Sequence, residues 1–215
     1  ERALFSIIKK YLKECKDIRF DGNGYSEEWQ EEAKRRALDT ETSVPLMIDQ
    51  YLNEKSVKMF SSTGVLNEAE LNSRCEVKWE NYSMKLQIES RVLGDLVINH
   101  VIPAAKRYQT ILLQNVLSVK QVFDALEADT LNQQDILLIK RIENHASAIV
   151  AGVEMMNKER AKANHIDNQR ERAITFHNHV VPLMEEIRKH VDDLEMVIDD
   201  QLWPLPKYRE LLFIH

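Results

Sequence analysis

The sequence is poor in residues that interrupt helices, with only five glycines and five prolines among 215 residues. Turn dipeptides are nearly absent, and Asp21-Gly22-Asn23-Gly24 is the strongest turn signal. Two cysteines, Cys15 and Cys75, show no metal-ligand spacing, whereas small secreted domains usually carry denser pairs, so we expect a reducing, cytoplasmic compartment. No apolar run approaches the roughly 20 residues that cross a bilayer, and we expect no membrane partner.

The charge balance limits the partners further. About 30% of the residues are charged, and the formal net charge is −6. Because non-specific nucleic-acid binding needs a positive surface that displaces counterions from phosphate, we expect no nucleic-acid partner. Lys, Arg and Glu on alternating faces are typical of a mainly helical protein. The chain begins in mid-helix register without Met, which predicts a piece of a longer protein.

Apolar residues recur at helical spacing along three long stretches, residues 86–123, 132–164 and 167–198. The first stripe is Leu86, Leu93, Val97, Val101, Ala105, Tyr108, Leu112, Val116, Val119 and Phe123. The second is Ile136, Ile139, Ile142, Ala146, Ile149, Val153 and Met156. The third is Ala173, Phe176, Val180, Met184, Ile187, Val191, Leu194 and Ile198. With short connectors, such as residues 124–130, these segments predict an antiparallel three-helix bundle.

Shorter helices are expected before the bundle. Residues 2–16 form an amphipathic pattern, and Ser26 begins a second helix as its N-cap. Pro45 suits the first turn of a third helix, and Gly64 suits a C-terminal stop. Asn67 predicts the N-terminus of the long helical region through a capping box with Glu70.

Two proline segments repeat each other, because Asn99-His100-Val101-Ile102-Pro103 returns as Asn178-His179-Val180-Val181-Pro182. Each proline removes a backbone donor and predicts a kink, near Val101 in the first case. Matched kinks and a chance echo are both compatible with the repeat.

The histidines and acidic residues do not assemble a metal site. His177 and His179, two residues apart, diverge on a helix. Glu186 and His190 share a face, but no Glu-x-x-His pair of the di-iron bundle type is present. We therefore expect ordinary surface histidines, no catalytic residue and no metal ligand. The acidic cluster Asp192, Asp193, Asp199 and Asp200 predicts a solvated face, and the two cysteines predict inert thiols.

The C-terminal tail, residues 202–213, concentrates large apolar side chains in a short segment, and its two prolines hold the first half extended. Each of these side chains, if left in water, would lose the roughly 1.5–3 kcal/mol of free energy that burial provides. We predict that the tail docks, on its own bundle or on another subunit, and both possibilities stay open. The candidate docking residues are Leu202, Trp203, Pro204, Leu205, Pro206, Tyr208, Leu211, Leu212 and Phe213.

The tail also carries a family resemblance. Leu202-Trp203-Pro204-Leu205-Pro206-Lys207-Tyr208-Arg209-Glu210-Leu211-Leu212-Phe213 closely resembles the extreme C-terminus of type III glutamine synthetases. Three further blocks resemble the same family in the right order. They are Phe20-Asp21-Gly22-Asn23-Gly24-Tyr25-Ser26-Glu27-Glu28-Trp29, Gln87-Ile88-Glu89-Ser90-Arg91-Val92-Leu93-Gly94-Asp95-Leu96 and Pro103-Ala104-Ala105-Lys106-Arg107-Tyr108-Gln109.

The resemblance implies a parent enzyme that ligates ammonia to glutamate with ATP and Mg²⁺ or Mn²⁺, in a homo-oligomer built from rings. The motifs that bind substrates and metals in that family precede the first residue of this chain, so we expect no cofactor in this part. The resemblance assigns residues 1–80 to the last helices of the catalytic domain and residues 81–215 to a helical extension specific to type III.

The predicted fold is therefore all-α: short helices from the end of a catalytic domain, followed by a long antiparallel three-helix bundle with a docked tail. The predicted function is support of oligomer assembly without catalysis. A free-standing helical-bundle interaction module is the alternative, and a bundle metalloenzyme lacks the inward-facing carboxylates and histidines that it needs.

Overall fold

The computed structural model describes residues 2–212, apart from the side chains of Arg2, Tyr208 and Arg209. These residues form helices and connecting turns without a strand, so the predicted all-α class is confirmed. No helix among them is both long enough and apolar enough to span a membrane. The chain divides into two units, Glu1–Thr42 and Ser43–His215.

The first unit contains α1 (Arg2–Glu14), the 3₁₀ turn η1 (Lys16–Ile18) and α2 (Glu27–Arg35). Ser26 caps α2 as predicted, because its Oγ accepts the backbone N–H of Trp29 at 3.3 Å. The Phe20 ring lies 4.7 Å from the Trp29 ring, centroid to centroid. A Cβ atom at Gly22 would lie 2.5 Å from Cζ of Phe20, so any other residue there would displace this ring.

The second unit begins with α3 (Val44–Asp49), the 3₁₀ turn η2 (Gln50–Leu52) and α4 (Glu54–Ser62). Pro45 lies in the first turn of α3, as predicted. Gly64 has a φ of +67° just after α4 ends, a left-handed conformation that glycine adopts at little cost. Both terminal signals were therefore correct.

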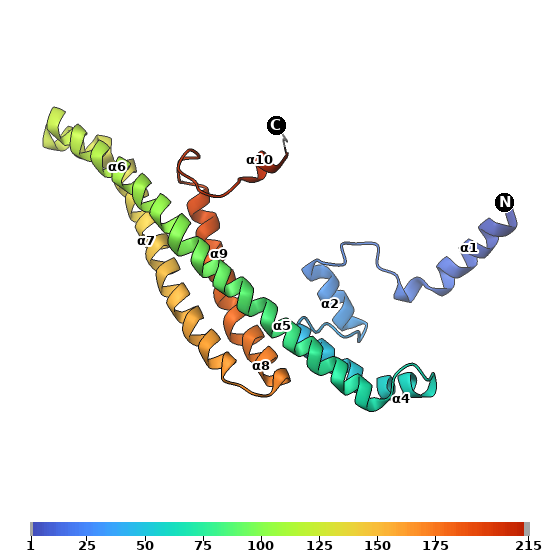
Figure 1. Ribbon diagram of the computed structural model, residues 1–215. Helices are drawn as coiled ribbons and strands as arrows, with labels where there is room; N and C mark the ends of the chain where they lie inside the picture. Colours follow the sequence, from blue (N-terminus) through green and yellow to red (C-terminus); the bar gives the residue numbers. More distant parts are fainter. Residues whose placement is uncertain (1, 213–215) are drawn as a thin grey trace. The chain divides into compact units, whose positions relative to one another are not determined.

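Three long helical segments make up most of this unit (Figure 1). The first joins α5 (Glu68–Leu96), the π turn η3 (Val97–Val101) and α6 (Ile102–Val122). The second is α7 (Ala125–Asn164), and the third joins α8 (Gln169–Thr175), the π turn η4 (Phe176–Val180) and α9 (Val181–Glu195). A short helix, α10 (Tyr208–Leu212), follows. The capping box of Asn67 and Glu70 is present at the start of α5, as predicted.

The direction of the segments follows from paired residues. Lys106 contacts Glu143 while Lys120 contacts Asp129, so α6 and α7 run antiparallel. On the other side of α7, His145 lies against His190 and Gly152 against Ile187, so α7 and α9 also run antiparallel. The first and third segments, both antiparallel to α7, are therefore parallel to each other.

The predicted connector at residues 124–130 was wrong. Instead, α7 begins at Ala125, and the Asp124 carboxylate caps it by accepting the backbone N–H groups of Leu126 and Glu127, each at 3.0 Å. An aspartate at this position satisfies donors that a helix leaves unpaired in its first turn. The polar residues read as a connector are therefore the exposed first turns of the helix.

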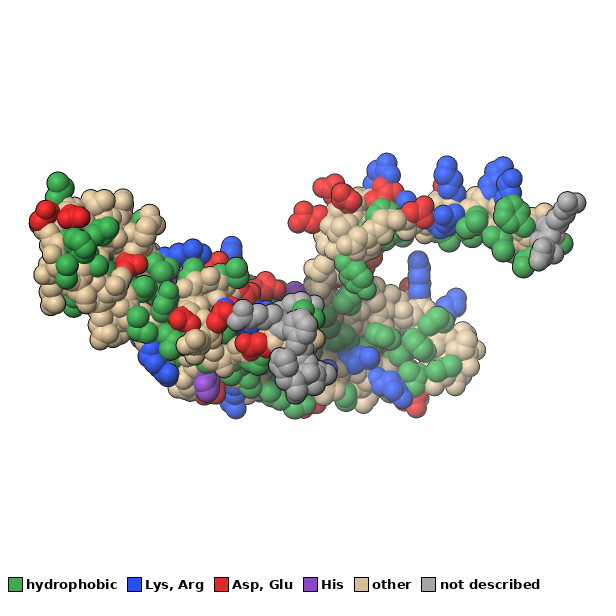
Figure 2. Space-filling view, turned by 90° about the horizontal axis from the view of Figure 1, so that it is seen from above, with side chains coloured by type: hydrophobic (Ala, Val, Ile, Leu, Met, Phe, Trp, Pro, Cys, Tyr) green, Lys and Arg blue, Asp and Glu red, His purple; other side chains and the backbone are tan. Residues whose placement is uncertain are grey.

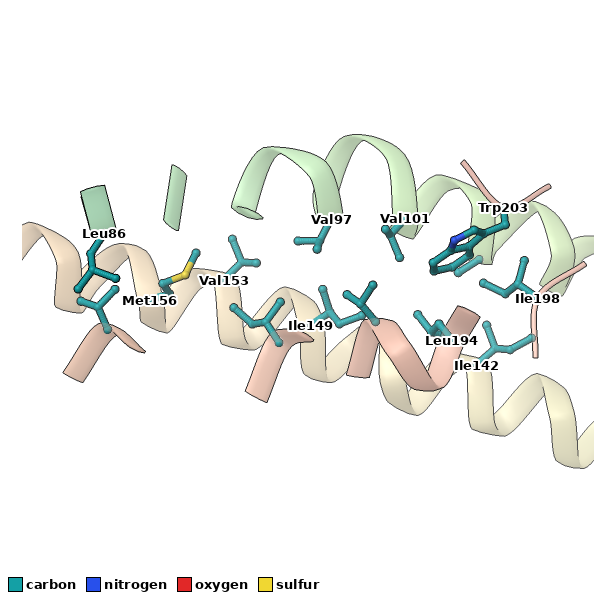
Figure 3. Close-up of a cluster of buried hydrophobic side chains, with 14 of the residues drawn as sticks. Leu86, Val97, Val101, Ile142, Ile149, Val153, Met156, Leu194, Ile198 and Trp203 are labelled. Atoms are coloured by element: carbon teal, nitrogen blue, oxygen red, sulfur yellow. The ribbon is translucent and has the colours of Figure 1, made fainter. Parts of the chain in front are cut away.

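The main core lies between the three segments and follows most of the predicted stripes (Figure 3), but Phe123 at the end of the first stripe is exposed. Figure 3 shows Val97 and Val101 of the first segment facing Ile149 of α7 and Leu194 of α9. A second cluster joins α3 to α5 and α8 through Ile48, Cys75, Trp79 and Ala173. Within it, the indole N–H of Trp79 donates to the Pro45 carbonyl at 3.0 Å.

A π turn lies directly before each of the two prolines at which the sequence predicted a kink. The backbone N–H of Ile102 bonds the Val97 carbonyl five residues back, directly before Pro103. In the same way the N–H of Val181 bonds the Phe176 carbonyl directly before Pro182. Proline lacks an N–H and cannot donate to the carbonyl four residues before it. The extra residue in each π turn accommodates this missing hydrogen bond. The repeated pentapeptide therefore marks the same local structure twice.

Candidate functional site

The first half of the C-terminal tail packs on the bundle of its own chain. After α9, the Asp199 carbonyl accepts the backbone N–H groups of Leu202 and Trp203, which turns the chain back. Trp203 is 8% exposed and joins the main core, where Figure 3 places its indole beside Val101 and Ile198. Leu202 and Leu205 pack against the same core, while Pro204 and Pro206 remain exposed.

Lys207 fixes the returning tail to the end of α9. Its ammonium donates to the Glu195 carbonyl at 3.0 Å and forms an ion pair with Asp200. A cation is favoured at this place because the unpaired carbonyls of a helix C-terminus carry partial negative charge. The Asp200 carboxylate is paired with this lysine, but Asp192, Asp199 and Asp200 are exposed, as the sequence predicted for a solvated acidic face, and Asp193 is half-buried.

The second half of the tail presents its apolar side chains to solvent. Leu211 and Leu212 of α10 are 68% and 57% exposed. The side chain of Tyr208 and all of Phe213 lie outside the described residues. Among the predicted docking residues, the structure therefore brings Leu202, Trp203 and Leu205 together and leaves Leu211 and Leu212 uncovered.

Three potential ligand residues converge between α7 and α9, and we call them the His–His–Asp cluster: His145, His190 and Asp193. His145 Nδ1 lies 3.0 Å from His190 Nδ1 and 3.9 Å from Asp193 Oδ2. Burial lowers the pKa of His145, the Asp193 carboxylate raises it, and His190 lowers it. Burial is the largest of these effects, and together they lower the pKa of His145.

Sequence reasoning missed this cluster. It considered His190 with its neighbours on the same helix, whereas the partner His145 comes from a position 45 residues earlier in the chain. The available signal was register: His145 lies between Ile142 and Ala146 of the second stripe, at the edge of the face that packs on the third segment.

The other histidines and cysteines behave more as predicted. His177 is half-buried and His179 exposed, so the pair does diverge. The Tyr82 hydroxyl lies 2.9 Å from His177 Nδ1, and burial raises the pKa of that phenol. Both cysteines are free, and burial raises the pKa of the Cys75 thiol, as expected for an unreactive group.

The fold defines the class of protein: a helical domain with a partly docked tail and, among its described residues, no strand. The sequence matches the family model of the glutamine synthetase C-terminal domain over residues 3–120, more than half of the chain. The chain therefore belongs to the glutamine synthetase C-terminal domain family.

Three relatives carry related names. A glutamine synthetase of Bacteroides fragilis (strain YCH46) is 46% identical over 99% of this chain. A type-3 glutamine synthetase of Dictyostelium discoideum is 31% identical over 100% of it, and a glutamine synthetase of Butyrivibrio fibrisolvens is 26% identical over 96%. In each case the match spans 29% of the relative's own length.

Proposed function

We propose that this chain is the helical C-terminal portion of an ATP-dependent glutamate–ammonia ligase, that it contributes no catalytic residue, and that it supports assembly of a cytoplasmic homo-oligomer. The family match and the type-3 relative support the first statement. Since the match spans 29% of each relative, the greater part of a comparable enzyme lies outside it. This favours a domain of a longer enzyme over a free-standing interaction module.

The role in assembly rests chiefly on the exposed end of the α6–α7 hairpin. The two helices lie side by side beyond the end of α9 (Figure 1), and Figure 2 shows hydrophobic side chains gathered at their end. Large apolar residues exposed there are Ile111, Leu113, Leu117, Val122, Phe123, Leu126, Leu131 and Leu137. Contiguous exposed apolar surface marks interaction sites, because each large side chain gains about 1.5–3 kcal/mol when buried.

Two further exposed apolar surfaces support the same role. Helix α1 presents Leu4, Ile7, Ile8, Tyr11 and Leu12. Helix α10 presents Leu211 and Leu212. The two leucines belong to the tail for which the sequence left docking on another subunit open, and both side chains are exposed.

The substrates glutamate, ammonia and ATP, with Mg²⁺ or Mn²⁺, are assigned by this proposal to the remainder of the enzyme. Among the described residues the potential metal ligands that come together are those of the His–His–Asp cluster. Two imidazoles and one carboxylate do not match Mg²⁺, which prefers an oxygen shell. No step of the ligase reaction is therefore attributed to the cluster.

Catalysis is tested by assaying ATP-dependent glutamine formation from glutamate and ammonia. The 215-residue chain is compared with the full-length enzyme that contains it. We expect activity in the full-length enzyme and none in the chain. Glutamine formation by the chain alone would contradict the non-catalytic assignment.

Assembly is tested in the full-length enzyme with the double variant Leu117→Glu/Leu126→Glu. Both leucines are exposed, so the charges leave the core intact and penalise only a contact made by the hairpin. We expect a smaller particle by light scattering, with an unchanged helix content. The control is Gln121→Glu/Gln133→Glu, which adds the same charge at exposed polar positions of the hairpin. An unchanged mass and activity in the leucine variant would rule out this contact.

A further inference from the structure

We propose that His145, His190 and Asp193 bind a divalent transition-metal ion, for which Zn²⁺ is the probe, and that the ion fastens α7 to α9. The proposal does not depend on the proposed function, because it is argued from the ligand atoms of this chain alone.

The ligand atoms lie at the spacing that a small metal ion needs. Nδ1 of His145, Nδ1 of His190 and a carboxylate oxygen of Asp193 all lie within 4.8 Å of one another. The two nitrogens are 3.0 Å apart. Two ligands at 2.0–2.1 Å from a tetrahedral Zn²⁺ stand about 3.3 Å apart, so a small movement of the rings accommodates the ion.

The carboxylate can complete the set. Asp193 Oδ2 lies 3.9 Å from His145 Nδ1, which is longer than the tetrahedral separation. The Asp193 side chain is 44% exposed, which leaves space for it to rotate toward the rings. It follows His190 by three residues on α9, and residues at this spacing share a helix face. The three residues leave one position of a tetrahedral site unfilled, and water would occupy it.

The chemistry of the set selects the class of ion. Two imidazole nitrogens and one carboxylate suit Zn²⁺ and other first-row transition metals. Mg²⁺ and Ca²⁺ favour oxygen ligands and gain little from two nitrogens. The direct contact between the two Nδ1 atoms is satisfied without an ion only when one ring carries the shared proton, whereas a metal ion uses both lone pairs.

The backbone on both sides of the cluster is fixed by the core. In the sequence, His145 lies between Ile142 and Ala146. His190 and Asp193 directly precede Val191 and Leu194. These four apolar neighbours are buried. The ligands therefore sit on rigid elements whose separation is set by packing, which is the arrangement that holds a metal site in place. Because α7 and α9 contribute one and two ligands, respectively, binding would cross-link them.

The test is a titration of the 215-residue chain with Zn²⁺, followed by calorimetry, together with Co²⁺ followed by visible absorption. We expect one ion per chain and a visible Co²⁺ spectrum of nitrogen–oxygen coordination. At a free Zn²⁺ concentration of about one hundred times Kd, the midpoint of thermal unfolding should rise by roughly 5–10 °C. Mg²⁺ at the same concentration should leave the midpoint unchanged.

The variants are His145→Asn, His190→Asn and Asp193→Asn, each expected to weaken Zn²⁺ binding by about tenfold or more. The matched control is His179→Asn, which removes an exposed histidine elsewhere in the third segment and should leave affinity within about twofold. Asp193→Asn keeps the test decisive if a histidine variant fails to fold, because the half-exposed carboxylate is not part of the core. The proposal is overturned if the chain takes up no stoichiometric Zn²⁺, or if affinity survives in His190→Asn and Asp193→Asn.

Discussion

Two glycines on the inner faces of the long helices differ in the space that surrounds them. A Cβ atom at Gly152 would lie 2.9 Å from Cγ1 of Ile187. At Gly94 the nearest atoms would be those of Met156 and Val153, at 3.6 and 3.7 Å, which is ordinary contact. The first glycine is thus required by close packing of α7 on α9, whereas the second leaves room for a methyl group.

We expect opposite effects from the same substitution. Gly152→Ala should lower the free energy of unfolding by about 1–2 kcal/mol, because forced repacking exceeds the gain in helix propensity. Gly94→Ala should raise it by about 0.5–1 kcal/mol, because alanine loses less backbone entropy in a helix. Chemical denaturation of the two variants checks both signs. A stabilised Gly152→Ala would show that α9 moves away without cost.

Between elements, α6 and α7 are joined by a polar network around Glu143. Its carboxylate forms an ion pair with Lys106 and accepts the Gln109 amide at 3.0 Å. These hydrogen bonds, that of Lys106 first, lower the pKa of Glu143 below its ordinary value of 4.5. A carboxylate with a lowered pKa stabilises the fold above its unfolded-state pKa, and the contribution is lost as the pH falls through the folded-state value.

Glu143→Gln should therefore be less stable than the parent chain at neutral pH, and the difference should shrink as the pH falls below about 4.5. The difference should stay below about 1 kcal/mol, because the Glu143 side chain is 48% exposed and its charge is screened by solvent. Thermal unfolding from pH 3 to 7 measures it, with Glu154→Gln on the same helix as the control. A difference independent of pH would assign the loss to packing and not to charge.

Elements were well predicted from sequence where the signal is local. Ser26, Pro45, Gly64 and Asn67 all act at helix ends, since a cap depends only on residues within one turn of it. The start of α7 was missed because Asp124 and the polar residues after it resemble a loop when their helical hydrogen bonds are unseen. The π turns are visible only in the backbone hydrogen bonds; from the sequence, kinks were expected at Pro103 and Pro182, and the repeated segment could equally have been a chance echo.

At the scale of the whole molecule, contacts between distant segments could not be derived from one sequence. The apolar stripes predicted most of the core, because residues that recur at the helical period lie on the face that packs inward. Val101, Ile149 and Leu194, one from each stripe, are buried. The His–His–Asp cluster depends instead on which residues of two helices lie opposite each other, which the stripes do not specify. The division of the tail, with Trp203 inside and Leu211 outside, depends on where α9 ends.

Both hydrophobic clusters are formed by residues of the second unit alone, and this predicts which truncations leave that unit folded. Every residue of the main core and of the cluster around Trp79 lies between Ile48 and Trp203. Removal of residues 1–42 should therefore leave the cooperative thermal transition of residues 43–215 in place. Its midpoint should lie within a few degrees of that of the second unit in the whole chain.

Removal of residues 1–66 should cost more, because it strips α3 from the second cluster. The Trp79 indole N–H would lose the Pro45 carbonyl, and Arg170 would lose both oxygens of Asp49, which it binds at 2.7 and 2.6 Å. With Ile48 also gone, we expect a loss of about 2–5 kcal/mol, read as a lower midpoint in chemical denaturation. Equal stability of the two truncated chains would mean that α3 contributes nothing to this unit and that its contacts with α5 and α8 are too weak to hold it there.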